Sequence, residues 1–262
     1  MKTGFVKTLL VASTLSAFCA ASVMAEEKLS MSDADKAMYE EMLENNPADV
    51  YVSEGEELIE EQLGGTAGFA KFLGVDEEEL PEYLAGFPRY IEKIGMVVAI
   101  DQAIQAAQAA NGKTPYKLKS SEMDALGAYV KSLANDVAIN IDVTADKHIK
   151  EMYELGKVTF ETRRGGRGLG CISCHSADIV GSRLRMQILP DLGDPKVKAS
   201  ATWPAYRMTK GKMFTLQQRF QQCMNNALLA KIPLGSKDMV ALEVYITNMA
   251  KGQTVAIPGL KR

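Results

Sequence analysis

The sequence predicts an all-α protein in which one arrangement of helices occurs twice along the chain. Apolar residues recur at helical spacing, and the alternating β-branched runs that would indicate strands are nearly absent. A pattern of some forty positions also recurs at a constant offset of 116 residues without a gap, which indicates a duplicated domain. About 237 residues remain after a predicted leader, enough for one large or two modest domains.

The first 25 residues have the pattern of a secretory signal peptide. Lys2 and Lys7 precede an apolar run from Leu9 to Ala21, and Val23-Met24-Ala25 is a cleavage site of the small-x-small type. The run is too short for a transmembrane helix, and no stop-transfer segment follows it. Cys19 lacks the small preceding residue of a lipoprotein site, so we expect it to be removed with the leader. The sequence therefore predicts a periplasmic protein.

In the first half, serine caps and Gly or Asn-Pro terminators bound the expected helices. These run from Ser30 or Ser32 to Leu43, from Ser53 to Leu63, from about Asp76 to Leu84, from Ile100 to Ala110, and from Ser120 or Ser121 to Leu133. Gly64-Gly65 ends the second helix, and a loop is expected from there to Asp76.

In the second half, the same signals predict three helices around an irregular region. Thr144 opens the first, in which apolar residues recur at helical spacing through Phe160. A long loop rich in Pro, Gly and charge follows from 180 to 215. The last two helices run from Leu216 to Leu229, and from the cap Ser236 to Met249.

The repeat is carried by particular residues as well as by helical character. At an offset of 116, the matching segments are Phe87-Pro88-Arg89-Tyr90 with Trp203-Pro204-Ala205-Tyr206, Gly95 with Gly211, and Met123 and Tyr129 with Met239 and Tyr245. Upstream, Gly55 corresponds to Gly156 at an offset of 101. Helices alone would give loose similarity, so the constant offset predicts an internal duplication.

Cys171, Cys174 and His175 form the pattern C-x-x-C-H, which is typical of covalent attachment of c-type haem. Each thiol adds to one vinyl group of the haem, and the adjacent imidazole then ligates the iron. A redox dithiol would need a βαβ context, and a zinc site would need a second ligand pair. The only other thiol of the mature chain, Cys223, is alone. The motif therefore predicts one covalent haem c with His175 as an iron ligand.

The duplication fails at the residues that carry chemistry. The region of the first half that corresponds to the motif, near 64–72, contains neither Cys nor His. Cys223 corresponds to Ala107, and Arg219 corresponds to Ala103. The sequence thus predicts two tandem cytochrome c-like domains, a haem-less one at 26–140 and a haem-binding one at 141–262.

The second axial position of the iron has three kinds of candidate ligand. His148 is the only other histidine, although a surface position is the simpler interpretation. Met208, Met213 and Met224 lie in the right region of the chain. Cys223 is the third candidate, and thiolate ligation would lower the reduction potential.

Arg219 and Cys223 are four positions apart, so on one helix they lie on the same face. A guanidinium beside a thiol lowers the pKa of the thiol and favours the thiolate. The forked donors of the guanidinium also suit an oxyanion. The alternative is a structural Cys223 with Arg219 in solvent.

Charge is distributed unevenly between the halves. Residues 26–140 contain 9 Lys and Arg against 23 Asp and Glu, a net charge of −14, whereas residues 141–262 contain 19 against 10, a net charge of +9. The basic half could steer an anion or an acidic partner toward the haem. Alternatively, the two halves neutralise each other across their interface.

These features together resemble the SoxA subunits of the SoxAX cytochromes of bacterial thiosulfate oxidation. The resemblance covers most of the mature chain and rests on C-I-S-C-H at 171–175, W-P-A-Y at 203–206, R-F-Q-Q-C at 219–223 and G-S-K-D-M-V-A-L-E-V-Y at 235–245. The haem-less first half is similar to that of the mono-haem SoxA type.

The resemblance implies an L-cysteine S-thiosulfotransferase, which joins thiosulfate oxidatively to a cysteine of the carrier SoxYZ. Cys223 would be both the iron ligand and the active-site sulfur, and Arg219 would hold the sulfonate or stabilise the thiolate. Electrons would leave through the haem to a downstream cytochrome acceptor. The implied partner is a SoxX-like cytochrome c subunit. Arg183, Arg185 and Lys210 are further basic residues that could contact haem propionates or substrate.

Three alternatives to this enzyme follow from the same residues. The first is a plain electron-transfer cytochrome with a methionine as the sixth ligand. The second is a haem-bearing scaffold whose acidic half docks a partner. The third is a thiosulfate dehydrogenase, which would join two thiosulfates to each other.

Overall fold

The structure, a computed structural model, describes residues 33–184 and 187–261. The described chain divides into two units at the boundary between Asn45 and Asn46. In the first unit, α1 spans Asp33–Glu44, close to the helix expected up to Leu43. The predicted signal peptide, and the serines expected to cap α1, lie outside the described residues. The second unit contains most of the first predicted half and all of the second.

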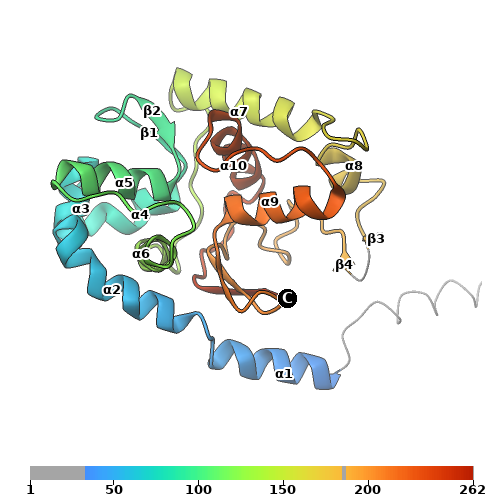
Figure 1. The fold of residues 1–262 in the computed structure, drawn as a ribbon, viewed down its shortest axis with the longest axis horizontal. Coiled ribbons are helices and arrows are strands. Elements are labelled where there is room, and N and C mark those ends of the chain that lie inside the picture. The colour runs from blue at the N-terminus through green and yellow to red at the C-terminus, as the bar shows by residue number, and fades with distance from the viewer. Residues whose placement is uncertain (1–32, 185–186, 262) are drawn as a thin grey trace, which may run out of the picture. The chain divides into compact units, whose positions relative to one another are not determined.

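The second unit is mainly helical, with strands of only two or three residues (Figure 1). Elements of its first half are α2 (Asp49–Leu63), α3 (Gly65–Leu73), the 3₁₀-helix Glu77–Glu79, α4 (Leu80–Ala85), β1 (Arg89–Ile91), β2 (Met96–Val98), α5 (Ile100–Ala110) and α6 (Ser121–Ser132). Elements of its second half are α7 (Lys147–Glu161), α8 (Ile172–His175), β3 (Arg183–Leu184), β4 (Gln187–Ile188), β5 (Ala205–Arg207), β6 (Lys212–Phe214), α9 (Leu216–Ala227), α10 (Lys237–Met249) and β7 (Gly259–Lys261). The predicted all-α class is confirmed. Within the described residues, none of the helices has the length and apolar character needed to span a bilayer.

Two details of the first half differ from the sequence expectation. The segment after Gly65, expected to be a loop, forms α3, which buries Phe69 and Leu73. Gly64 and Gly65 both adopt a φ of 75°, so they turn the chain sharply between two helices. Helix α2 also begins at Asp49, one turn before the expected Ser53.

The second half differs in its first helix and in its long loop. Asp146, and not Thr144, caps α7, since its carboxylate accepts hydrogen bonds from the main-chain N–H groups of His148 (2.6 Å) and Ile149 (3.0 Å). Thr144 instead donates its hydroxyl to Asp142 at 2.7 Å. The segment 180–215 contains the antiparallel pair of β3 and β4 and a second one, formed by β5 and β6.

The duplication appears in the geometry of equivalent elements. Strands β1 and β2 pair with Arg89 opposite Val98, and β5 and β6 pair with Ala205 opposite Phe214, both shifted by 116 residues. Ser120 and Ser236 accept hydrogen bonds at the starts of α6 and α10 from Met123 and Met239. Each capped helix follows one hairpin and one helix, so the two halves share a common frame.

A glycine marks the same helix crossing in each half. A Cβ on Gly55 of α2 would lie 2.2 Å from the Ala125 carbonyl oxygen of α6. A Cβ on Gly156 of α7 would lie 2.0 Å from the Ala241 carbonyl oxygen of α10. Main chain therefore packs directly on main chain at both crossings, which explains why glycine occurs at both positions.

The two halves meet about a pseudo-two-fold axis. Ala138 and Thr254, which are equivalent positions, form an antiparallel bridge with each other. On either side of it, the Ile139 N–H donates to the Gln253 carbonyl and the Val255 N–H donates to the Val137 carbonyl, both at 2.9 Å. Each bond is the counterpart of the other under the 116-residue offset. The largest buried apolar cluster contains residues of both halves, so their core is continuous.

Candidate functional site

A tightly packed loop positions the C-x-x-C-H segment after α7. The Arg164 N–H donates to the Leu169 carbonyl at 2.9 Å, and the Arg164 guanidinium donates to the Thr159 carbonyl at 3.1 Å. A Cβ on Gly165 would lie 2.7 Å from the main chain of Ala230. A Cβ on Gly170 would lie 2.9 Å from the carbonyl oxygen of Glu161. The loop can therefore lie against neighbouring main chain, and this holds Cys171 in place.

One helical turn, α8, holds both thiols and the imidazole of the motif. The main-chain N–H groups of Cys174 and His175 both donate to the Cys171 carbonyl at 3.0 Å. His175 Nδ1 lies 2.9 Å from the Pro190 carbonyl oxygen, which can only accept a hydrogen bond. Nδ1 therefore carries the proton, and the lone pair of Nε2 remains available for a metal. Burial lowers the pKa of His175, which favours the neutral form that metal binding requires.

Cys223 of α9 lies in the electrostatic environment of these thiols. Burial, followed by the neighbouring Cys223, raises the pKa of Cys171 to about 11 and also raises the pKa of Cys174. All three thiols are free of disulfide bonds. Cys171 also packs against an apolar cluster that contains Phe160 and Met224. The fold thus gathers three cysteines that are distant in the sequence.

Arg219 lies one turn before Cys223 on α9, as the sequence predicted. Its guanidinium donates to Gln222 at 3.0 Å, and both Arg219 and Cys223 are half-buried. The charge of Arg219 contributes to the lowered pKa of His175. Arg219 is therefore near the imidazole and one turn from the thiol of Cys223.

Three of the other candidate ligands have contacts of their own, and Met208 directly follows Arg207, where its N–H donates to the Lys261 carbonyl at 2.9 Å. His148 stacks on Tyr90 with ring centroids 4.1 Å apart, at the start of α7. The 15 residues of α7 place it about 20 Å from the end of the helix that leads to the motif. Met213 is fully buried beside Ala48 and Ala128. The sulfur of Met224 lies 3.5 Å from the main-chain nitrogen of Ile232.

Two basic residues near this site were not singled out in the sequence. Arg207, at the end of β5, is 4% exposed, and its Nε makes no hydrogen bond. Burial and the neighbouring Arg219 lower the pKa of Arg207 to about 10. Burial, with the charges of Lys198, Arg207 and Arg219, lowers the pKa of Lys261 to about 8. The comparison of repeats would have identified Arg207, because Ile91 occupies its equivalent position.

The residues present fit a covalent haem c. Two free thiols flank one helical turn, and the next side chain is an imidazole whose Nε2 is free. The buried, unpaired Arg207 supplies a positive charge of the kind that an acidic cofactor would neutralise. Cys171, Cys174 and His175 are the residues that would hold the haem.

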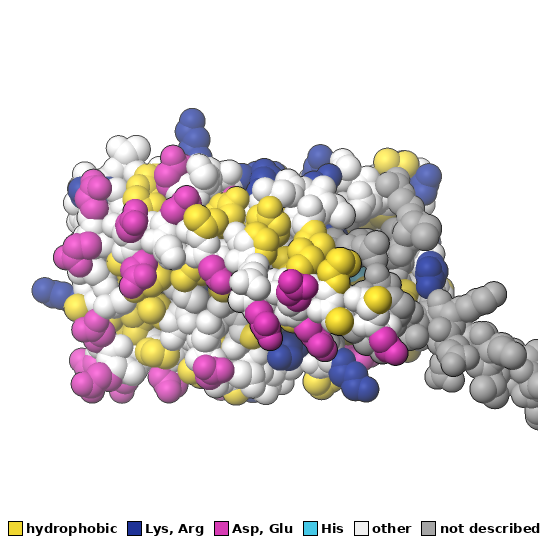
Figure 2. All heavy atoms as spheres, turned by 90° about the horizontal axis from the view of Figure 1, so that it is seen from below, with side chains coloured by type: hydrophobic (Ala, Val, Ile, Leu, Met, Phe, Trp, Pro, Cys, Tyr) yellow, Lys and Arg dark blue, Asp and Glu magenta, His cyan; other side chains and the backbone are white. Residues whose placement is uncertain are grey.

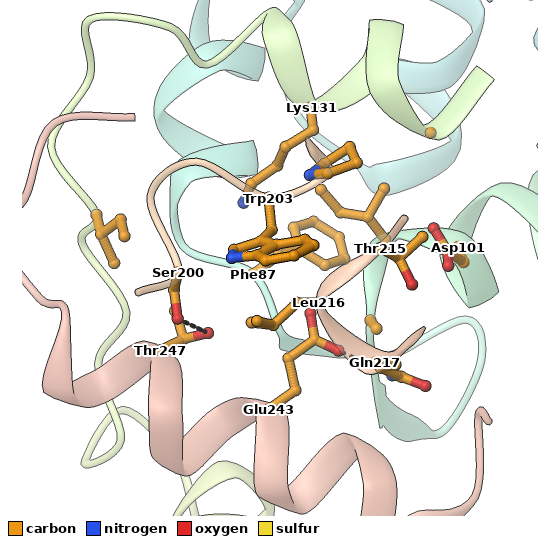
Figure 3. A pocket seen from close by; sticks show the side chains of 15 residues that line it. Phe87, Asp101, Lys131, Ser200, Trp203, Thr215, Leu216, Gln217, Glu243 and Thr247 are labelled. Atoms are coloured by element: carbon orange, nitrogen blue, oxygen red, sulfur yellow. Dashed lines mark hydrogen bonds between the residues drawn. The ribbon is translucent and has the colours of Figure 1, made fainter. Parts of the chain in front are cut away.

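A separate cavity lies between the two halves, away from the cysteines (Figure 3). Phe87 and Trp203 line it from equivalent positions, and Lys131 and Glu243 reach it from opposite sides. Burial raises the pKa of Asp101 to about 8 and raises the pKa of Glu243, and it lowers the pKa of Lys131 to about 8. These titratable groups are shielded from bulk water and face a space large enough for water molecules.

The surface retains the charge asymmetry of the sequence. Acidic side chains crowd the end of the face in Figure 2 that the first half forms. By contrast, Lys198, Arg207 and Arg219 of the second half lie within electrostatic reach of Lys261. Arg207 is also close to Cys223, and Arg219 to His175. This part of the second half is thus suited to anions.

Comparisons with known proteins identify the family of this chain. A family model described as the SoxA/TsdA cytochrome c domain matches residues 55–139 and 191–255. The L-cysteine S-thiosulfotransferase subunit SoxA of Hydrogenophilus thermoluteolus is 31% identical over 235 residues, which cover 85% of each chain. The subunit of the same name from Hydrogenobacter thermophilus is 28% identical over 222 residues, covering 82% of each. The crystal structure of SoxXA from P. pantotrophus has the same fold, with a TM-score of 0.69 and 23% identity over 83% of this chain and 79% of that one.

Proposed function

Because this chain belongs to the SoxA/TsdA cytochrome c family, we propose that it is a haem c enzyme of thiosulfate oxidation, an L-cysteine S-thiosulfotransferase. The observation that carries the proposal is the position of Cys223 and Arg219. They lie one turn apart on α9, beside the thiols and the imidazole of the C-x-x-C-H segment. The first half has alanine at both equivalent positions and lacks the motif.

Each residue has a definite role in the proposed site. Cys171 and Cys174 would attach the haem, and His175 would ligate its iron through Nε2 while the Pro190 carbonyl fixes the ring. Cys223 would be a further iron ligand and the sulfur at which the reaction occurs. Arg219 binds the sulfonate end of thiosulfate through its forked donors.

The reaction forms one sulfur–sulfur bond. The thiol of the carrier protein loses its proton and joins the outer sulfur of thiosulfate, and two electrons leave. The haem supplies the route for those electrons to a cytochrome acceptor. Arg219 holds the anion in place, and its charge offsets the repulsion between thiosulfate and a thiolate.

Partners and location follow from the same proposal. A SoxX-like cytochrome c subunit pairs with this chain, and the SoxYZ carrier presents the acceptor cysteine. The predicted signal peptide and the need for haem c attachment outside the cytoplasm favour the periplasm. The charges of Arg207 and Arg219, which lie close to Cys223 and His175, would draw thiosulfate, a dianion, toward the site.

A variant of Cys223 tests the proposal. In the purified complex, Cys223→Ala should keep its haem, because Cys171 and Cys174 hold it, and should lose thiosulfate-dependent conjugation of the carrier. Asn226→Ala, another half-buried change on α9, is the matched control. Wild-type turnover in Cys223→Ala would refute the proposal. A methionine–iron absorption band near ~700 nm would instead identify a plain electron carrier.

Product analysis separates the related enzyme. Conjugated carrier is the expected product, whereas two joined thiosulfates in the absence of carrier would indicate a thiosulfate dehydrogenase. Mass spectrometry of the mature protein would test for one haem, for removal of the leader after Ala25, and for an added sulfur of ~32 Da on Cys223.

A further inference from the structure

Arg207 is a buried cation without a partner. It is 4% exposed, its Nε makes no hydrogen bond, and it forms no ion pair with any residue that the structure describes. A buried charge that is neither paired nor hydrogen-bonded costs several kcal/mol. An anion that is absent from the polypeptide would remove that cost.

The surroundings of Arg207 increase the need for an anion. Lys261 of β7 pairs with Arg207 of β5 in the same register, so their side chains leave the same face of the sheet. Arg219 and Lys198 add further positive charge, and both act on Lys261. Like charges held together in a partly buried space repel each other, unless a negative group lies between them.

This arrangement is confined to the half with the haem motif. Ile91 occupies the position equivalent to Arg207, and it is 2% exposed in the apolar core. Among the described strands, β1 pairs with β2 alone, whereas β5 pairs with both β6 and β7. The additional strand β7 is what brings Lys261 beside Arg207. The cationic pair and the haem motif therefore occur together.

Burial distinguishes a resident anion from a passing one. Arg219 is half-buried, which suits a substrate that enters and leaves. Arg207 is nearly inaccessible, so its counterion must remain in place between turnovers. A c-type haem carries two propionate carboxylates and is covalently resident. Its carboxylates have the charge and the forked geometry that a guanidinium binds best.

We propose that Arg207 and Lys261 form a carboxylate-binding site that holds a propionate of the haem. The inference rests on the haem c of the proposed function, but not on the thiosulfate chemistry. Lys210 and Arg183, which the sequence suggested for this role, are exposed, and Arg185 lies outside the described residues.

The test is the reduction potential of the covalent haem, measured by spectroelectrochemistry from pH 5 to pH 8 without thiosulfate. In Arg207→Met, which keeps the length of the side chain, the potential should fall, because an uncompensated propionate stabilises ferric iron. The pKa of the propionate should also rise, so the potential should become more dependent on pH. Arg207→Lys should restore most of the wild-type behaviour.

Two further variants complete the experiment. Lys261→Met should shift the potential in the same direction, and it remains informative if Arg207→Met does not fold. Lys210→Met, on the exposed turn between β5 and β6, is the control and should leave the potential unchanged.

Potentials in Arg207→Met and Lys261→Met that match the control at every pH would overturn the proposal. A raised KM for thiosulfate beside those unchanged potentials would assign the cations to the sulfonate. The potential is measured without thiosulfate and does not depend on turnover. A negative result would therefore overturn the propionate site and leave the proposed role of Cys223 untouched.

Discussion

The crossing of α7 and α10 makes a quantitative prediction for Gly156→Ala. A Cβ at this position would lie 2.0 Å from the Ala241 carbonyl oxygen and 2.8 Å from the Cβ of Tyr245. Carbon and oxygen atoms in contact are normally more than ~3 Å apart. Since the nearest atom belongs to the main chain of a helix, no side chain can rotate away. The two helices must separate by about 1 Å or bend.

The expected free-energy change is the difference between two effects. Alanine is intrinsically better than glycine inside a helix by about 1 kcal/mol. Overpacking costs about 1–3 kcal/mol and more when rigid atoms collide, and the contact here is with rigid main chain. Taking the upper end of that overpacking cost, we expect a net loss of about 2 kcal/mol in the free energy of unfolding. For a domain of this size, that corresponds to a fall in Tm of roughly 4–8 °C.

Thermal unfolding of the purified haem-loaded protein, followed by circular dichroism, measures the effect. Gly166→Ala is the matched control, because a Cβ at Gly166 meets no atom within 4 Å. Gly55→Ala should behave like Gly156→Ala, since its Cβ would lie 2.2 Å from the equivalent Ala125 carbonyl oxygen. A Gly156→Ala protein as stable as the control would show that the crossing is looser than the structure indicates.

Three other changes have definite expected outcomes. Burial raises the pKa of Asp101 to about 8, so the folded protein keeps a proton on this carboxyl that the unfolded chain loses. The contribution of this proton to the free energy of unfolding is complete below about pH 4 and is lost as the pH rises through 8. In urea titrations, Asp101→Asn should therefore be more stable than wild type at pH 8 by about 2 kcal/mol or more, and this gain should shrink toward pH 5. An equal gain at both pH values would contradict the raised pKa of Asp101. Trp203→Ala should lower the free energy of unfolding in urea by about 3–5 kcal/mol. Trp203→Phe should lower it by less than ~1.5 kcal/mol, because Phe occupies the equivalent position 87. Equal losses in the two variants would show that positions 87 and 203 are not packed alike. Ser236→Ala removes the cap of α10 and should lower the free energy of unfolding by about 1 kcal/mol, measured from urea midpoints. Ser236→Asp keeps a capping oxygen and should not lower it. No change in Ser236→Ala would mean that the cap is dispensable.

Local signals account for the elements that the sequence predicted well. Helix α5 spans Ile100–Ala110 as expected, and Ser236 caps the last helix, which ends at Met249. Caps and terminators act through hydrogen bonds within one or two turns, so they can be read from the nearby sequence alone. The repeat added long-range information, because the same crossings and hairpins had to occur twice.

The elements that were missed depend on longer-range contacts. Gly64-Gly65 ends a helix, but only the packing of Phe69 and Leu73 shows that another helix begins at once. Strands of two or three residues are too short to show an alternating pattern. Strand β7 pairs with β5 across more than fifty residues, and no local signal indicates such a partner.

The site was predictable only as far as its chemistry is local. C-x-x-C-H is a contiguous motif, and Arg219 with Cys223 lies within one helical turn. Arg207 has no such pattern around it, and its significance comes from burial, from its missing partner and from the strand beside it. A position-by-position comparison of the repeats would still have found it, since Ile91 faces the core of the first half.

The residues that differ between the halves explain how one frame serves two purposes. In the first half, Ile91, Ala103 and Ala107 are all buried in the apolar core. In the second half, the equivalent positions hold Arg207, Arg219 and Cys223, which lie within one another's electrostatic reach and close to the haem cysteines. At these three positions, the first half has apolar side chains and the second half has two cations and a thiol. Main-chain contacts such as the glycine crossings preserve the frame in both halves, so the mismatches between the repeats at these positions mark the residues that we propose bind the haem and its substrate.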